Sequence, residues 1–97
     1  MRLTDEQRAS ILTIVRRHCG DAAAVYLFGS RCNDASRGGD VDLLIEHDAD
    51  IGLLQRAKIA QALQERLFLP VDIVAKNRND AVETPFQHIA RAGAERL

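Results

Sequence analysis

The sequence contains no tryptophan, one tyrosine and two cysteines. Cys19 and Cys32 are too few for a disulfide framework and lack both CxxC spacing and a Cys/His pattern of metal ligands, so we expect free thiols. The longest apolar run, Ala22 to Phe28, is far shorter than the roughly 20 residues that a membrane-spanning helix needs. The N-terminus also lacks the basic-then-apolar order of a secretion signal. We therefore expect a cytoplasmic protein that does not bind membranes.

An excess of charge of either sign is also missing. The 13 lysines and arginines nearly balance the 14 aspartates and glutamates, and the formal net charge is −1. Because nucleic-acid-binding domains are typically basic, we do not expect a nucleic-acid partner. The 97 residues, 46% of them hydrophobic and 28% charged, suit one globular domain with one modest core. We predict a single domain over residues 1–97.

Periodicity and capping signals predict an α/β fold. Thr4-Asp5-Glu6-Gln7 has the form of a capping box, which predicts a helix from Asp5 to Cys19 that ends at Gly20. A second helix is predicted from Ile51 to Leu67, capped by Asp50, and a third helix is predicted to begin at Thr84-Pro85. The expected apolar stripe of the second helix consists of Leu54, Ala57, Ile59, Ala62, Leu63 and Leu67.

The second helix would connect two strands, and a crossover of this length favours one central sheet. We expect a small mixed sheet of three to four strands, with the helices packed mainly on one face and acidic side chains on the other. His47 and His88 are expected to face solvent.

A glycine and a serine follow the first predicted strand. Ala24 to Phe28 reads as a buried strand, after which Gly29 and Ser30 would open a turn whose free N–H groups attract phosphate. Glycine suits this position because phosphate must approach bare backbone. Arg31 and Arg37 follow and offer bidentate donors for phosphate oxygens, although Arg37 is equally consistent with a solvated loop charge.

Carboxylates recur on two later predicted strands. Asp40 and Asp42 alternate with apolar residues in the segment from Asp40 to Glu46, so both side chains share one face about 7 Å apart. Asp72 occupies a similar position in the predicted strand from Val71 to Ala75. Oxygen ligands at this spacing suit hard cations such as Mg²⁺, which also bind substrate phosphates.

Taken singly, each of these motifs is also explained by an ordinary turn or by the solvent face of a strand. In combination, Gly29-Ser30, a short spacer, Asp40-Val41-Asp42 and the later strand residue Asp72 resemble the nucleotidyltransferase superfamily that includes DNA polymerase beta. The chain is most similar to the minimal nucleotidyltransferases of prokaryotes. The resemblance spans roughly residues 24 to 75 and predicts the polymerase beta-like fold.

The resemblance implies a two-metal transfer of a nucleotide. Asp40, Asp42 and Asp72 would hold two Mg²⁺ ions once the nucleotide is bound, and Gly29 and Ser30 would hold the outer phosphates of ATP. Asp72 and its metal would activate an incoming hydroxyl, which attacks the α-phosphorus and expels pyrophosphate.

The family also implies a protein partner. Minimal nucleotidyltransferases are often encoded beside a helical HEPN-type protein, and act as the antitoxin that adenylylates a tyrosine of that toxin. Two alternatives stay open: a non-catalytic antitoxin module that binds its partner on the same fold, and a nucleotidyltransferase that modifies nucleic acid. The net charge weakens the second alternative. The sequence is also compatible with a homo-oligomer.

Overall fold

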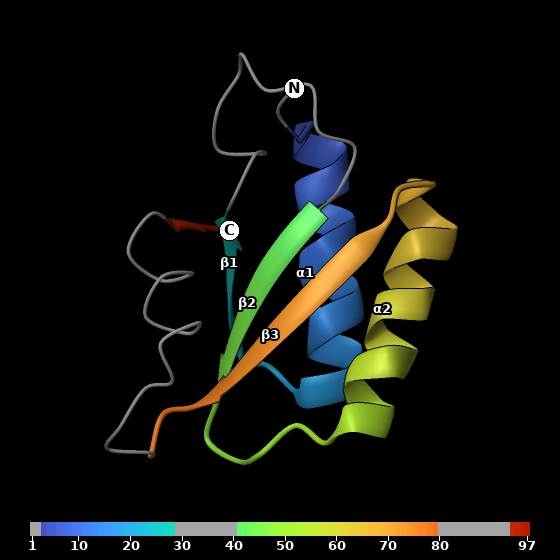
Figure 1. Cartoon of the computed structure of the whole chain (residues 1–97). Coiled ribbons are helices and arrows are strands. Elements are labelled where there is room, and N and C mark those ends of the chain that lie inside the picture. The colour runs from blue at the N-terminus through green and yellow to red at the C-terminus, as the bar shows by residue number, and fades with distance from the viewer. Residues whose placement is uncertain (1–2, 29–40, 80–93) are drawn as a thin grey trace.

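The computed structural model describes residues 3–28, 41–79 and 94–97, and it combines a mixed sheet with two helices (Figure 1). Along the chain the elements are α1 (Asp5–Cys19), β1 (Ala24–Phe28), β2 (Val41–His47), α2 (Leu53–Leu67), β3 (Val71–Asn77) and β4 (Glu95–Arg96). The sheet has the strand order β3-β2-β1-β4. β2 and β3 are parallel, whereas β1 is antiparallel to both β2 and β4. The predicted third helix lies outside the described residues.

The helices α1 and α2 lie side by side over one face of the sheet (Figure 1). The core between the two layers is built from apolar side chains of both helices and of three strands, including Ile11, Val15, Val25, Leu27, Val41, Leu43, Ile45, Ile59, Leu63 and Val71. This arrangement confirms the expected mixed sheet with helices on one face. None of the helices in the described ranges has the length and apolar content needed to cross a membrane.

Helix α1 begins and ends where the sequence predicts. The Gln7 N–H donates to the Thr4 Oγ1 at 3.1 Å, and the Thr4 N–H donates to the Gln7 Oε1 at 2.8 Å, which completes the capping box. At the other end, Gly20 has a φ of 86°, a left-handed conformation that glycine adopts without a steric penalty.

Helix α2 departs from the prediction at its N-terminus. It begins at Leu53, and its N-cap Gly52 provides no side-chain hydrogen bond. Asp50, the predicted cap, instead accepts a hydrogen bond from the Asn77 side chain at 3.1 Å. The prediction that Leu54 is buried is also wrong, because 71% of this residue is exposed.

The geometry of an α-helix explains this exposure. The buried residues of α2 are Ile59, Leu63 and Leu67, which recur every four residues and form one row. At about 100° per residue, Leu54 is rotated by roughly 140° from Ile59 and therefore faces away from the sheet. Ala57 is rotated by roughly 160° and is exposed as well, so its predicted burial is also wrong.

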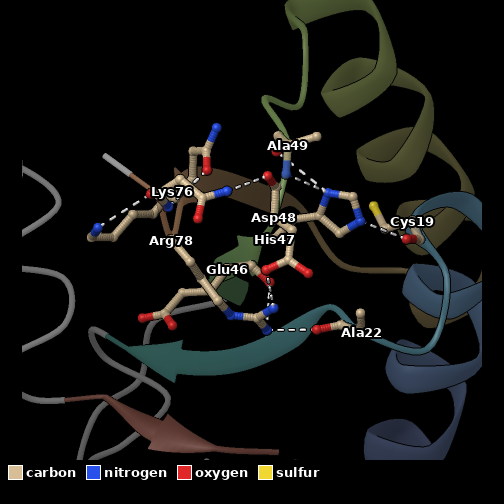
Figure 2. A network of polar contacts seen from close by, with 10 residues as sticks. Cys19, Ala22, Glu46, His47, Asp48, Ala49, Lys76 and Arg78 are labelled. Atoms are coloured by element: carbon tan, nitrogen blue, oxygen red, sulfur yellow. Dashed lines mark hydrogen bonds and ion pairs between the residues drawn. The ribbon is translucent and has the colours of Figure 1, made fainter. Parts of the chain in front are cut away.

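A network of polar contacts lies at the end of the sheet where β2 and β3 finish (Figure 2). His47 is half-buried rather than facing solvent: its Nε2 donates to the Cys19 carbonyl at 2.7 Å, and its Nδ1 accepts from the Ala49 N–H at 3.3 Å. The carbonyl of Cys19 is among the last of α1 and has no acceptor role inside the helix. His47 therefore joins the end of β2 to the end of α1.

Arg78, which no sequence pattern singled out, makes several of the contacts at this end of the sheet. Its guanidinium donates to the carbonyls of Ala22 and Glu46 and forms an ion pair with Asp48 at 3.0 Å. Its backbone N–H also donates to the His47 carbonyl at 2.9 Å. One side chain thus links the α1–β1 connection, the end of β2 and the end of β3 (Figure 2).

Candidate functional site

Two of the predicted acids lie side by side on the sheet. Asp42 of β2 pairs in register with Asp72 of β3, and the two strands are parallel. Neighbouring strands lie about 4.8 Å apart, so these side chains leave the sheet next to each other. Asp42 is half-buried and Asp72 is exposed.

Both acids project from the face that α1 and α2 leave uncovered. Their neighbours along the strands, Val41, Leu43 and Val71, are buried in the core beneath the helices. Because side chains alternate along a strand, Asp42 and Asp72 must face the opposite side. The alternation of acidic and apolar residues in the sequence therefore places two carboxylates together on the face opposite the helices.

The end of β1 lies at the same edge of the sheet. Phe28, the last residue of β1, is the register partner of Asp42. The chain thus leaves β1 beside Asp42 and returns to β2 at Val41, one residue before that acid. The other predicted site residues, Gly29, Ser30, Arg31, Arg37 and Asp40, lie outside the described residues.

The donor set of this pair suits a hard cation. Two carboxylates on adjacent strands offer only oxygen atoms, which Mg²⁺ accepts while keeping positions for water and phosphate. Over residues 3–28, 41–79 and 94–97 there is no group of three or more His, Cys, Asp or Glu residues placed to hold a metal ion. The third predicted ligand, Asp40, is outside these ranges, so the described residues provide two of the three expected ligands.

Sequence reasoning missed a buried lysine on the same face. Lys76 is four residues after Asp72 on β3, is only 7% exposed and pairs in register with Glu46. Its Nζ donates to the Asn77 carbonyl at 3.4 Å. The period-two alternation that places Asp72 on this face also places Lys76 there, so the signal was present in the sequence. The face opposite the helices thus carries a cation as well as acids.

A groove of about 190 Å³ begins beside Asp72. It is lined by one side of α2 and by the start of β3, namely Leu53, Arg56, Ala57, Ala60, Val71, Asp72 and Ile73. Two larger cavities, of about 380 and 310 Å³, are lined only by residues of α1 and α2. These two lie on the helical layer, away from the paired acids.

The strand order, the helices on one face and the paired acids are those of the polymerase beta-like nucleotidyltransferase fold. In sequence, residues 10–94 match the family "Polymerase beta, Nucleotidyltransferase". The match covers most of the chain, and the protein therefore belongs to this family. No curated protein was found to match the chain in sequence.

Solved structures with the same fold include minimal nucleotidyltransferases from toxin–antitoxin complexes. A chain of a toxin–antitoxin complex with AMP-PNP is 20% identical, with a TM-score of 0.78 over 97% of this chain and 72% of that chain. A chain from the complex of a tri-AMPylated HEPN toxin with its MNT antitoxin, from Shewanella oneidensis, is 19% identical, with a TM-score of 0.76 over 97% and 71% of the two chains. A third structure, assigned to the minimal nucleotidyltransferases, is 27% identical, with a TM-score of 0.67 over 95% and 89% of the two chains.

Proposed function

We propose that this protein is a Mg²⁺-dependent nucleotidyltransferase that moves AMP from ATP to a tyrosine hydroxyl of a HEPN-type partner, and that it acts as an antitoxin. The observation that supports this most directly is the in-register pairing of Asp42 and Asp72 on the face of the sheet opposite the helices. The AMPylated HEPN toxin and the AMP-PNP complex among the structural relatives support the choice of donor and acceptor.

The site residues divide between the metal and the phosphates. Asp42 and Asp72, with Asp40, offer the oxygens that hold Mg²⁺, which supplies charge neutralisation for the triphosphate. Gly29 and Ser30 bind the outer phosphates through backbone N–H groups at the end of β1. Arg31 and Arg37 add positive charge in the same segment.

The transfer is an in-line displacement at the α-phosphorus. The tyrosine oxygen forms a bond to this phosphorus, the bond from the α-phosphorus to the oxygen bridging it to the β-phosphorus breaks, and pyrophosphate leaves. The hydroxyl proton passes to the carboxylate of Asp72, which is the more exposed acid of the pair. The contribution of the protein is mainly positioning, because the acids would hold, at one edge of the sheet, the Mg²⁺ that neutralises the triphosphate.

Label transfer tests this proposal. The wild type and Asp42→Asn are incubated with Mg²⁺, proteins of the source cell and ATP labelled at either the α- or the γ-phosphate. We expect a protein band labelled from α-labelled ATP by the wild type, and none with Asp42→Asn or with EDTA. Label from the γ-phosphate should stay in pyrophosphate. A band labelled from the γ-phosphate, or no α-labelled band with the wild type, would contradict nucleotidyl transfer.

Neutralisation of the partner by contact alone is the second candidate function. Large exposed apolar side chains favour it, since Leu54 is 71% and Phe68 is 88% exposed. Growth of cells that produce the partner separates the two functions. If Asp42→Asn binds the partner but no longer protects the cells, catalysis is required; full protection by this variant would favour contact alone.

A further inference from the structure

We propose that the groove between α2 and the start of β3 binds an acidic segment of the acceptor protein next to its reactive tyrosine, and that Arg56 selects this segment. The inference rests on the proposed function, because it identifies where the acceptor of that reaction docks. Four observations lead to it: the continuity of the groove with Asp72, its size, its lining and the state of Arg56.

The groove reaches one residue of the acid pair, Asp72. Asp72 lines it together with its neighbours Val71 and Ile73. The Asp72 carboxylate faces the side of the sheet opposite α2, but β3 is an edge strand, so a chain held in this groove can continue around that edge to the carboxylate that takes the proton of the acceptor hydroxyl in the proposed reaction. The larger cavities on α1 and α2 do not share this property, because no residue of the sheet lines them.

The size of the groove fits peptide side chains better than a nucleotide. Small-molecule pockets typically measure about 300–1,000 Å³. The groove measures about 190 Å³, which is below this range and leaves room for only a small part of a ligand. A whole nucleotide therefore fits the groove poorly, whereas a short run of residues from a protein can place a side chain in it.

The lining comes from one stripe of α2. Leu53, Arg56, Ala57 and Ala60 follow the spacing i, i+3, i+4, i+7, which places them on one side of the helix. This stripe is distinct from the row that packs on the sheet. The small side chains of the two alanines leave space in the groove. Leu53 is 76% exposed. The stripe thus offers an apolar contact beside a single cation.

The charge of Arg56 indicates the chemistry of the occupant. Its Nε atom is buried and has no hydrogen-bond partner. The ion pairs found within the described parts of the chain join Arg8 to Glu95 and Arg78 to Asp48, and neither includes Arg56. Arg56 lines the groove, and a guanidinium that takes part in neither ion pair favours a carboxylate ligand, which binds its outer N–H groups through charge-assisted hydrogen bonds. An aspartate or glutamate near the acceptor tyrosine meets this requirement.

Peptide binding tests the inference. Two short tyrosine peptides are compared that differ only in having aspartates or asparagines beside the tyrosine. Each is titrated into the ¹⁵N-labelled full chain, without nucleotide, while amide chemical shifts are recorded. We expect the aspartate peptide to shift the amides of Arg56, Ala57, Ala60 and Ile73, and to bind about tenfold more tightly than the asparagine peptide.

Variants of α2 make the test specific. Arg56→Glu should weaken binding of the aspartate peptide by about tenfold or more, and Arg56→Gln should weaken it less because an amide still donates hydrogen bonds. Lys58→Glu changes charge equally on an exposed position outside the groove and should change the affinity less than about twofold. The spectrum of each variant without peptide shows whether the fold is retained.

The outcomes separate this inference from the proposed function. Equal binding of both peptides, unchanged binding by Arg56→Glu and Arg56→Gln, or shifts confined to other surfaces would overturn the docking site. None of these results bears on label transfer from ATP, which tests the function itself. Peptide binding in the groove with no label transfer to any protein would instead overturn the function.

Discussion

At the residue scale, the pairing of Asp42 with Asp72 places two like charges directly opposite each other. Such pairs destabilise a sheet, by about 0.2–1 kcal/mol for exposed positions. A cation bound between the two carboxylates would relieve this repulsion. A carboxylate pair at the end of β1, where the sequence predicts the phosphate-binding turn, is more readily explained by ligand binding than by folding.

We predict that Asp72→Asn changes stability and activity in opposite directions. Without Mg²⁺ the variant should unfold at a higher urea concentration than the wild type, corresponding to about 0.2–1 kcal/mol, because the repulsion from Asp42 is removed. Its transfer activity should fall at least about 100-fold, because the base and metal ligand is lost. Urea unfolding and label transfer measure the two effects.

The control for Asp72→Asn is the response to Mg²⁺. The wild type should gain stability on addition of millimolar Mg²⁺, whereas Asp72→Asn should gain less, because a ligand that binds only the folded state stabilises it in proportion to its affinity. An equal gain for both proteins would show that Asp72 does not take part in metal binding.

A second prediction concerns Cys19, a free thiol at the end of α1. Burial raises the pKa of this thiol, because desolvation disfavours the thiolate. The free energy of unfolding is therefore unaffected by this thiol below the pKa of cysteine in the unfolded chain. It falls as the pH rises from that pKa through the higher pKa of Cys19 in the folded protein. In a Cys32→Ser variant, iodoacetamide should therefore modify Cys19 more slowly in the folded protein than in urea. Equal rates across mildly alkaline pH would contradict this.

The third prediction is that Phe68→Gly stabilises the protein. Phe68 ends α2 with a φ of 58°, a left-handed conformation that is unfavourable for any residue with a Cβ atom. The residue is 88% exposed, so its side chain contributes little burial to the fold. Glycine relieves the strain and should raise the free energy of unfolding by about 0.5–1 kcal/mol, measured by urea unfolding. Phe68→Ala, which keeps the Cβ atom, is the matched control and should show no gain.

At the scale of elements, Arg78 holds together the end of the sheet far from the paired acids. Its hydrogen bonds to the carbonyls of Ala22 and Glu46 join the α1–β1 connection to the end of β2. The ion pair with Asp48 involves a carboxylate whose side chain is 62% exposed, and such pairs contribute little. The carbonyl contacts should therefore dominate the stabilisation by Arg78.

This difference gives a fourth prediction. Arg78→Ala should lower the free energy of unfolding by about 1–3 kcal/mol, since charge-assisted hydrogen bonds to two carbonyls are lost. Asp48→Ala removes only the exposed ion pair and should cost less than about 1 kcal/mol. Equal losses in urea unfolding would show that the ion pair, rather than the carbonyl contacts, is the source of the stability.

The elements also show which features the sequence could predict. The bounds of α1 follow from a capping box and a glycine, which are local signals, and β1 follows from a continuous apolar run. The start of α2 could not be predicted in this way, because the Asp50 carboxylate accepts a hydrogen bond from the side chain of Asn77, which is 27 residues away in the chain. A choice between a local cap and a distant partner depends on tertiary structure, and no pattern in the sequence expresses it.

At the scale of the whole molecule, the two-layer arrangement followed from the alternation in β2 and from the crossover helix. The position of β4 could not be predicted, because Glu95 and Arg96 pair with β1, which lies far away in the sequence. An ion pair from Arg8 to Glu95 at 2.8 Å fixes the same end to α1. For the site, the sequence predicted that Asp42 and Asp72 share one face. The groove beside Asp72 could not be predicted, because it forms only where α2 packs against β3.

The central claim is that the paired acids catalyse AMP transfer to a partner protein rather than merely belonging to a binding surface. Intact-mass measurement of the partner, purified after co-expression with the wild type or with Asp42→Asn, tests it most directly. We predict a partner that carries AMP on a tyrosine when the wild type is present and an unmodified partner with Asp42→Asn. An unmodified partner in a stable complex with the wild type would contradict the claim.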